Sequence, residues 1–296
     1  ASSLMYPPGL FADTSELVEL SKVAAEYDGM YISHMRDEGA HMIEAVDELL
    51  TIARDANIRA EIYHIKSSGQ ANWHLFDKAV EMVEAARADG LEITADVYTY
   101  PAGSTGLNVT VPPWVQEGGF DESIRRMSDP ALREKIIREM NTESGDWENM
   151  FLAVGSPENI LMVSFKSEAL KPLTGKTVAD VAAMRGTSPE NTIMDLIIED
   201  GSRIGTVYFT QSEDLLRKAV ALPWVSVNSD ETSAPPEGGV LKRNPHPRAY
   251  GSFARVLGKY VRDEKVITLQ EAIRKLSALP AQTMRIDRRG ELRQGF

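Results

Sequence analysis

The chain has 296 residues, of which 43% are hydrophobic and 26% charged, a composition typical of a globular protein with a sizeable core. Acidic residues outnumber basic ones by 44 to 32, and the net charge of -12 argues against nucleic acid as a partner, because a phosphate backbone favours a basic surface. Cysteine is absent, no apolar run is long enough to cross a membrane, and no secretory signal pattern opens the sequence; we therefore expect a cytoplasmic protein with no membrane partner.

The first hundred residues alternate between helical and strand patterns. A helix is expected over residues 14–26, with the Thr14 hydroxyl as its cap and with an inward face made of Leu17, Leu20, Val23 and Ala24. The elements expected next are a strand at 30–34, a helix at 41–56, a strand at 60–65, a helix at 75–88 and a strand at 91–98. Strands and helices that alternate at about 30-residue spacing indicate parallel strands with helical crossovers. We therefore predict an α/β fold, and a (β/α) barrel in preference to a doubly wound sheet.

The pattern loosens after residue 100 and then returns. Gly- and Pro-rich segments, a charged helix at 131–140 and short strand-like pieces fill residues 101–204, which we interpret as an insertion or lid. A strand at 206–210, a helix at 213–219, a strand at 224–228 and two closing helices follow. We thus expect one catalytic domain in three parts: βα units of the barrel over 1–100, the insertion over 101–204, and the final barrel strand or strands with the C-terminal helices over 205–296.

Both ends of the chain are abrupt. The first residue is Ala1, the first methionine is Met5, and the last residues stop where a turn would lead into another strand. We interpret the chain as a fragment, and the barrel as incomplete.

Three residues that can carry metal chemistry follow predicted strands. His34 and His64 end two strands that are one βα unit apart, and Asp230 follows a third. The carboxyl ends of barrel strands form one face, so these side chains are expected to converge there. Two imidazoles with carboxylates suit Zn, Fe, Mn or Ni, and Asp230 could accept a proton from a metal-bound water. Polar strand ends and a turn aspartate explain the same residues without a metal.

Two cations lie near these residues. Lys66 is two positions after His64, and Arg248 is downstream of Asp230. Together they suit a substrate that carries a free carboxylate, because Arg provides a bidentate fork and Lys a point charge. Surface cations are the plainer interpretation, and Lys66 could instead form a Schiff base or be carboxylated to bridge metals.

Aromatic residues follow the strand expected at 91–98. Tyr98 and Tyr100 could orient a substrate or stabilise an oxyanion, although packing is the commoner role of such side chains. His41 and His74 are interpreted as helical residues without a ligand role. The sequence contains none of the patterns GxGxxG, GxxxxGK[ST], GxSxG or HExxH, which argues against nucleotide-binding, α/β-hydrolase and zincin functions.

Taken together, several segments resemble one family. YISHMRDEG, EIYHIKSSG, DVYTYPAGST, VNSD and HPRAYGSFARVLGKYVRDE are similar to segments of the D-aminoacylase (N-acyl-D-amino-acid deacylase) branch of the amidohydrolase superfamily, and the similarity runs along nearly the whole chain. The resemblance implies a distorted (β/α) barrel and metal-dependent hydrolysis of the amide bond of N-acyl-D-amino acids or related acylated amino acids and dipeptides.

The resemblance also implies a role for individual residues. His34 and His64 would be metal ligands, most simply of zinc, and Asp230 the catalytic aspartate that moves the proton. The residues that would contact the substrate are Tyr6, Lys66, Tyr98, Ser104 and Arg248. The family commonly has Tyr-Pro-Tyr where this chain has Tyr98-Thr99-Tyr100, so the resemblance leaves open which tyrosine acts.

Family features that precede this region are missing from the chain. They are an HxH pair and a bridging Cys or Glu, and the small β-sandwich that carries the chain termini in the family is absent too. The expected partners are accordingly a small molecule with a free carboxylate and either a second copy in a homo-oligomer or a missing N-terminal portion. Two alternatives remain: a truncated, non-catalytic binding or assembly subunit, and a lyase or aldolase that uses Lys66 as a Schiff-base amine.

Overall fold

The fold is built on a parallel sheet whose strands alternate with helices. The computed structural model describes residues 1–143, 147–233, 235, 237 and 244–296. The parallel sheet has the order β1-β2-β3-β4-β8, and its strands are Ser2–Ser3, Met30–His34, Arg59–Ile62, Ile93–Val97 and Val225–Val227. The helices that connect these strands are α1 (Thr14–Ala25), α2 (Met42–Asp55), α3 (Leu75–Ala88) and α9 (Glu213–Ala221).

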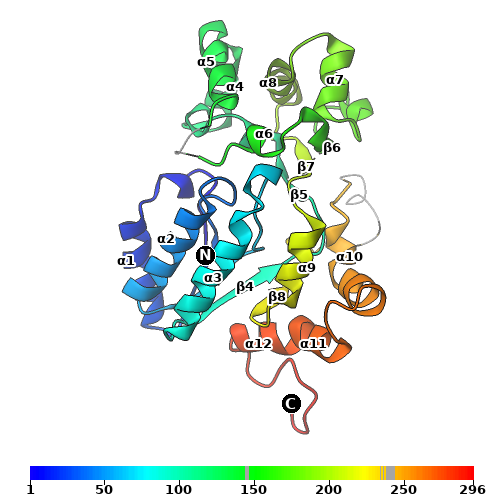
Figure 1. Cartoon of the computed structure of the whole chain (residues 1–296). Coiled ribbons are helices and arrows are strands. Elements are labelled where there is room, and N and C mark those ends of the chain that lie inside the picture. The colour runs from blue at the N-terminus through cyan, green and yellow to red at the C-terminus, as the bar shows by residue number, and fades with distance from the viewer. Residues whose placement is uncertain (144–146, 234, 236, 238–243) are drawn as a thin grey trace.

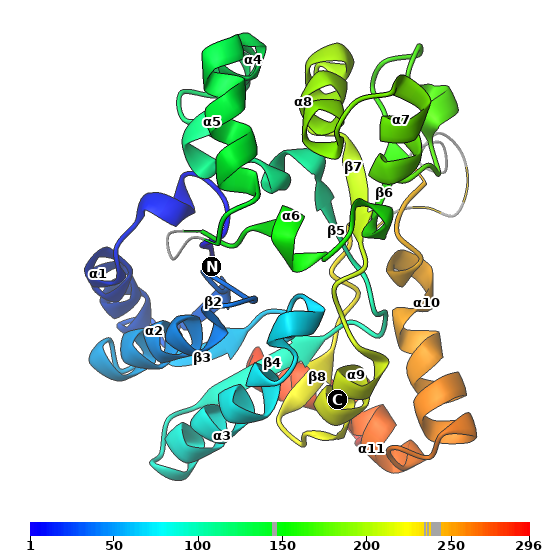
Figure 2. The ribbon, with the colours of Figure 1, turned by 45° about the horizontal axis from the view of Figure 1, so that its top comes forward.

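These helices lie side by side along the sheet (Figures 1 and 2). Within the described residues β1 and β8 form the two edges of the sheet, which therefore stays open. An open run of parallel strands with helical crossovers on one face is the arrangement expected of an incomplete (β/α) barrel.

The two faces of the sheet differ in chemistry because side chains alternate along a strand. On the helix side, Ile62 pairs in register with Ala95, which pairs with Val225, and all three are buried in the main hydrophobic cluster. The opposite face carries polar side chains, including His34, Glu61, Asp96 and Ser226. The apolar rows hold the helices on the sheet, which leaves the other face and the strand ends for chemistry.

The residues expected to form an insertion build a second layer with its own core. Strands β5 (Gly103–Gly106), β6 (Ile160–Ser164) and β7 (Gly205–Tyr208) form an antiparallel sheet of order β5-β7-β6. The helices of this layer are α4 (Phe120–Ser128), α5 (Pro130–Met140), α6 (Met150–Ala153), α7 (Val178–Arg185) and α8 (Pro189–Asp200). A second hydrophobic cluster joins them, and they stand at the top of Figure 1.

The strand expected at 206–210 thus forms as β7, but it is not a strand of the parallel sheet. Its Tyr208 is buried in the second hydrophobic cluster, and both of its edges pair with strands of the insertion. The alternation of apolar residues could predict the strand itself. Its partners could not be predicted, because local periodicity carries no information on pairing.

Helix α1 differs from the expectation in its cap and in its buried face. The Asp13 side chain caps it by accepting from the Glu16 N–H, whereas the Thr14 hydroxyl donates to Glu48. Leu17 is buried as expected, but Leu20 and Val23 are 62% and 57% exposed, so their assignment to the inward face was wrong. The buried stripe of this helix is narrower and consists of Leu17, Val18 and Ser21.

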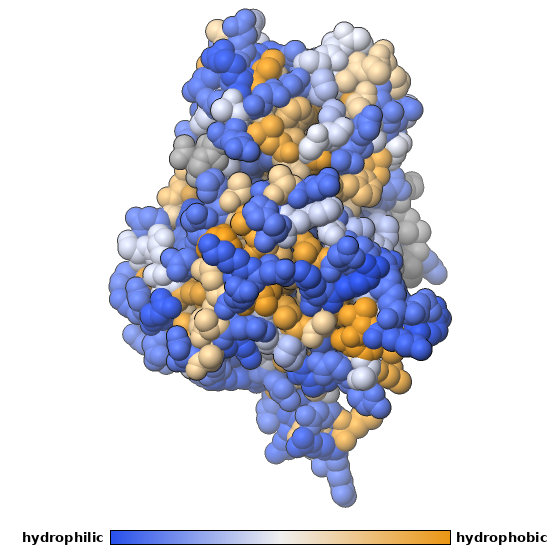
Figure 3. Space-filling model, in the orientation of Figure 1, coloured by the Kyte–Doolittle hydropathy of each residue, from blue (hydrophilic) through white to orange (hydrophobic). Residues whose placement is uncertain are grey.

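The chain closes with α10 (Arg248–Arg255), α11 (Leu269–Ile273) and α12 (Leu279–Thr283), with π-helical segments at Val256–Asp263 and Arg274–Ala278. Figure 3 shows one face of the molecule, on which hydrophilic residues surround smaller apolar patches. None of the described helices has the combination of length and apolar composition that a bilayer crossing requires.

Lys275, in the second π-helical segment, is a buried cation under β8. Its side chain is fully buried, and its ammonium group donates to the carbonyl oxygens of Leu222 and Val225. Burial lowers the pKa of Lys275 to about 8, below the ordinary value of 10.5. Below pH 8 this lysine is protonated in both the folded and the unfolded states. The cost of burying its charge then lowers the free energy of unfolding by its full amount.

We therefore expect the free energy of unfolding to rise between about pH 8 and pH 10.5, because the unfolded chain then binds a proton that the folded chain has released. The contribution of Lys275 is about 3 kcal/mol. Urea denaturation of the wild type and of Lys275→Met across this range measures the difference. The substituted protein should lack this component, and parallel pH profiles would contradict the prediction.

Candidate metal centre

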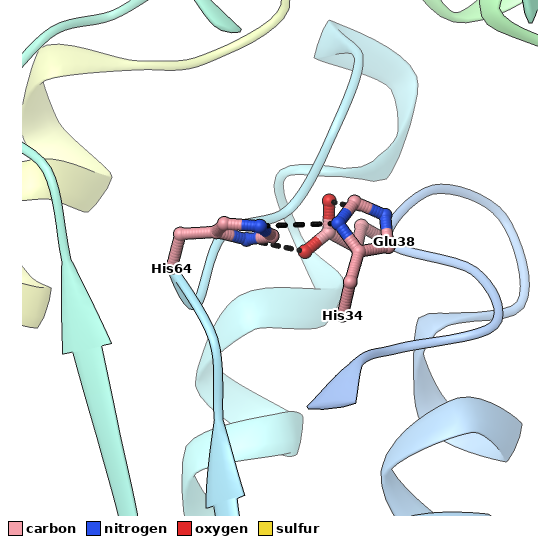
Figure 4. A group of neighbouring side chains, drawn as sticks. All are labelled: His34, Glu38 and His64. Carbon is pink, nitrogen blue, oxygen red and sulfur yellow. Dashed lines mark hydrogen bonds and ion pairs between the residues drawn. The ribbon is translucent and has the colours of Figure 1, made fainter. Parts of the chain in front are cut away.

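The two histidines expected to be metal ligands are in contact. His34 is the last residue of β2, as expected. The strand expected at 60–65 ends as β3 at Ile62, so His64 follows the strand, although the prediction had placed it inside. The His34 Nδ1 and His64 Nε2 atoms are 3.0 Å apart, and both residues are buried. Figure 4 shows the two rings facing each other from neighbouring strand ends. The prediction that these strand ends converge is therefore confirmed by the geometry.

Glu38 completes the group, although it was not among the residues predicted from the sequence. It lies in the loop after β2, with Oε1 3.1 Å from His64 Nδ1 and Oε2 3.7 Å from His34 Nε2. His34, Glu38 and His64 place one ligand atom each within 4.8 Å of one another. The signal was present in the sequence: Glu38 is four residues after His34 in a polar segment that directly follows a strand.

The loop that carries Glu38 is held by backbone contacts. The Glu38 N–H donates to Glu148 Oε2 of the insertion at 3.0 Å, and its carbonyl oxygen accepts from the Ser68 N–H at 2.6 Å. Glu148 is buried, and burial together with the nearby carboxylates of Asp37 and Glu38 raises its pKa well above the ordinary value. The insertion thus contributes directly to the shape of this site.

The electrostatics of the group favour ligation. Burial lowers the pKa of His34 to about 3, which keeps its imidazole neutral, as a metal ligand must be. Among the residues that the structure describes, the buried His34 Nε2 atom has no hydrogen-bond partner. A buried imidazole nitrogen without a hydrogen-bond partner is a position at which a metal ion could bind.

Lys66 is bound to the same carboxylate. Its ammonium group forms an ion pair with Glu38 Oε2 and lies 2.8 Å from His64 Nδ1. Burial alone would lower the pKa of Lys66, but the Glu38 carboxylate outweighs it and raises this pKa above its ordinary value. Burial likewise opposes ionisation of Glu38, but its interactions with the neighbouring His34, Lys66 and His64 side chains prevail and lower the pKa of Glu38. Lys66 is therefore a cation and not a neutral amine of the kind that forms a Schiff base.

A second ion pair lines the same pocket. Arg248, the first residue of α10, is buried and its Nη1 is 2.6 Å from Asp230 Oδ2. The guanidinium carbon lies 4.6 Å from the centre of the Tyr98 ring, and the Lys66 ammonium lies 5.8 Å from the same centre. Two cations thus face one aromatic ring. Asp230 lines the pocket but is not part of the compact group of His34, Glu38 and His64.

The structure distinguishes between the two tyrosines. Tyr98 is buried in the pocket wall, and its hydroxyl oxygen accepts from the Gln211 amide at 2.5 Å. Tyr100 lies instead against His246, with ring centres 5.5 Å apart, and is not among the residues that line the pocket.

The eight residues to which the family resemblance assigns a role all line one pocket. It has a volume of about 560 Å³, and the eight are Tyr6, His34, His64, Lys66, Tyr98, Ser104, Asp230 and Arg248. Tyr6 donates to the Thr105 hydroxyl at 3.0 Å, and Ser104 donates to the Thr206 carbonyl at 3.0 Å. Glu38, Tyr63, Glu148 and Tyr208 line the same pocket and were not anticipated.

Comparisons with known proteins found similar sequences and similar solved structures. No family model matches the chain. The chain is similar along its whole length to the D-aminoacylase and the N-acyl-D-glutamate deacylase of Alcaligenes xylosoxydans xylosoxydans, with 28% identity to each and 49% of each relative covered. The chain therefore spans about half the length of the curated relatives it matches.

A solved structure extends the similarity to the fold. The N-acyl-D-glutamate deacylase of Bordetella bronchiseptica superimposes with a TM-score of 0.75 at 28% identity, over 99% of this chain and 50% of that one. That structure holds zinc and a phosphonate inhibitor that mimics the tetrahedral intermediate of the reaction. Zinc in the relative agrees with the donor set of His34, Glu38 and His64 in this chain.

Proposed function

We propose that this chain, which corresponds to the C-terminal part of the D-aminoacylase family, provides one side of an active site for metal-dependent hydrolysis of N-acyl-D-amino acids or related acylated amino acids and dipeptides. The observation that carries the proposal is the buried His34 Nε2 atom, which has no hydrogen-bond partner among the described residues and lies beside Glu38 and His64 in a pocket that also holds two cations. Neutral imidazole with a carboxylate is a donor set that suits zinc.

Different residues of the pocket would bind the metal and transfer the proton. A divalent metal held by His34, His64 and Glu38 would supply Lewis acidity at the carbonyl of the amide. Asp230, in the segment that follows β8, would take the proton of the attacking water and deliver it to the leaving nitrogen. Its ion pair with Arg248 keeps the carboxylate directed into the pocket.

Substrate binding would rest on the two cations. Lys66 and Arg248 lie over the same Tyr98 ring and suit the α-carboxylate of an acylated amino acid. Tyr6 and Ser104 would line the space beside it. In this proposal residues 101–204, together with β7, act as an insertion that closes the pocket wall through Ser104 and Glu148, while 1–100 and the residues after β7 supply the barrel side.

Metal content tests the proposal without any choice of substrate. The purified chain, dialysed after incubation with zinc, is expected to retain stoichiometric metal by elemental analysis, and His34→Ala/His64→Ala is expected to lose it. The matched control is His41→Ala/His74→Ala, which removes two histidines that do not line this pocket and should retain the metal. Equal metal content in the two double variants, or no metal in the wild type, would contradict the proposed function.

A further inference from the structure

The backbone at His64 departs from the regular parallel ladder. The Tyr63 N–H donates to the Ser33 carbonyl of β2 at 2.9 Å, and the Ile65 N–H donates to the Asp96 carbonyl of β4, also at 2.9 Å. In a regular strand the N–H groups of successive residues point to opposite neighbouring strands. The N–H groups of residues 63 and 65 would therefore both face β2. The extra residue is His64, whose φ of +37° lies in the left-handed region that non-glycine residues seldom adopt.

This irregularity leaves the buried His64 N–H without a carbonyl partner in the ladder. The Asp96 side chain supplies the acceptor: Oδ1 lies 2.5 Å from the His64 nitrogen. Asp96 itself is buried on the polar face of β4, in register with Ser226 of β8. Its side chain also interacts with Asn228, two residues before Asp230. One carboxylate therefore connects the segment that ends in a candidate ligand with the segment that ends in the candidate proton carrier.

We propose that Asp96 is a positioning residue of the metal centre, which holds the His64 backbone in its left-handed conformation and so aims the imidazole at His34 and Glu38. The proposal rests on the proposed function to the extent that His64 binds metal. Asp96 has no place in the compact ligand group, and its contact with His64 is made to the main chain. Asp96 therefore acts on the metal centre indirectly. It fixes the main chain at His64, and the main chain sets the direction of the His64 ring.

Two substitutions separate this role from generic destabilisation. Asp96→Asn retains an oxygen that can accept from the His64 N–H, whereas Asp96→Ala removes it. Ser226→Ala is the matched control, because it deletes a buried hydroxyl from the same face of the sheet at the position paired with Asp96. If Asp96 positions His64, Asp96→Ala should weaken both the protection of the His64 amide and the affinity for zinc. Asp96→Asn and Ser226→Ala should leave both largely unchanged.

The hydrogen bond is tested in the metal-free chain by amide hydrogen exchange. We expect the His64 amide to be protected in the wild type, in Asp96→Asn and in Ser226→Ala, and to exchange rapidly in Asp96→Ala. An unprotected His64 amide in the wild type would overturn the proposal even where Asp96→Ala does not fold.

The consequence for the metal is tested by competition between each chain and a chromogenic zinc chelator. Loss of a group that orients a ligand typically weakens metal affinity by about 10–100-fold. We expect a loss of this size for Asp96→Ala. For Asp96→Asn and Ser226→Ala we expect the affinity to change by less than about threefold. Equal affinities for Asp96→Ala and Ser226→Ala would overturn the positioning role. A wild-type chain that binds no zinc while its His64 amide is protected would refute the metal site and leave the hydrogen bond intact, so the two failures are distinguishable.

Discussion

Glu38→Ala is expected to lower the free energy of unfolding by about 3–5 kcal/mol, because it leaves the Lys66 ammonium group buried without its counter-charge. The Glu38 side chain is 2% exposed and that of Lys66 is 11% exposed, so the pair is largely shielded from water. Urea denaturation of the metal-free chain at pH 7 measures the effect. The same substitution removes a candidate ligand, and zinc retention should fall with it.

A second substitution identifies the cause. Lys66→Met in the Glu38→Ala background should restore much of the lost stability, since it removes the uncompensated charge and keeps an apolar stem. Glu122→Ala provides the comparison, because it breaks the exposed Glu122–Arg125 pair and should change stability by less than about 1 kcal/mol. Similar losses for Glu38→Ala and Glu122→Ala would show that the buried pair has no special weight.

Arg248→Met is expected to weaken binding of an N-acyl-D-amino acid by at least about tenfold. A loss of this size corresponds to the loss of one hydrogen bond between charged groups. The reason is that Arg248 is the guanidinium in the pocket and that it faces Tyr98 together with Lys66. Arg248→Lys should recover only part of the loss, because an ammonium group cannot reproduce the bidentate fork. Calorimetric titration of the zinc-loaded chain with N-acetyl-D-methionine gives the dissociation constants.

The control for this experiment is Arg262→Met, which removes an exposed guanidinium that pairs with the adjacent Asp263. It should leave affinity unchanged. If both arginine variants bind the ligand as the wild type does, the carboxylate is held elsewhere and Arg248 serves only to orient Asp230.

The elements around the site could largely be predicted from the sequence, because periodicity and strand ends are local signals. The strand Met30–His34 and the helix Leu75–Ala88 form with the predicted boundaries. Strand ends in a parallel sheet share one edge, which is why sequence alone could place His34 beside His64. The boundary after Ile62 could not be predicted, because the break there depends on the carboxylate of Asp96 from another strand.

The residues that were missed depend on contacts between distant segments. Glu148 reaches the backbone of Glu38 from the insertion, and no periodic pattern marks it. Glu38 sits in a loop, where sequence patterns predict turns but not the direction of a side chain. Tyr98 and Tyr100 are equivalent in the sequence, and only the turn after β4 places one in the pocket and the other against His246.

The bond from the Glu38 N–H to Glu148 also has a consequence for the order of folding. The two residues are 110 positions apart, and Arg248 lies a further hundred positions along the chain. Loops of this length close late, since their entropy must be lost before the contacts form. A nascent chain that has emerged only as far as the third helix therefore carries both histidines but not the contact that holds their carboxylate partner. Metal capture by such an intermediate would be weak, and the centre matures only when the insertion docks.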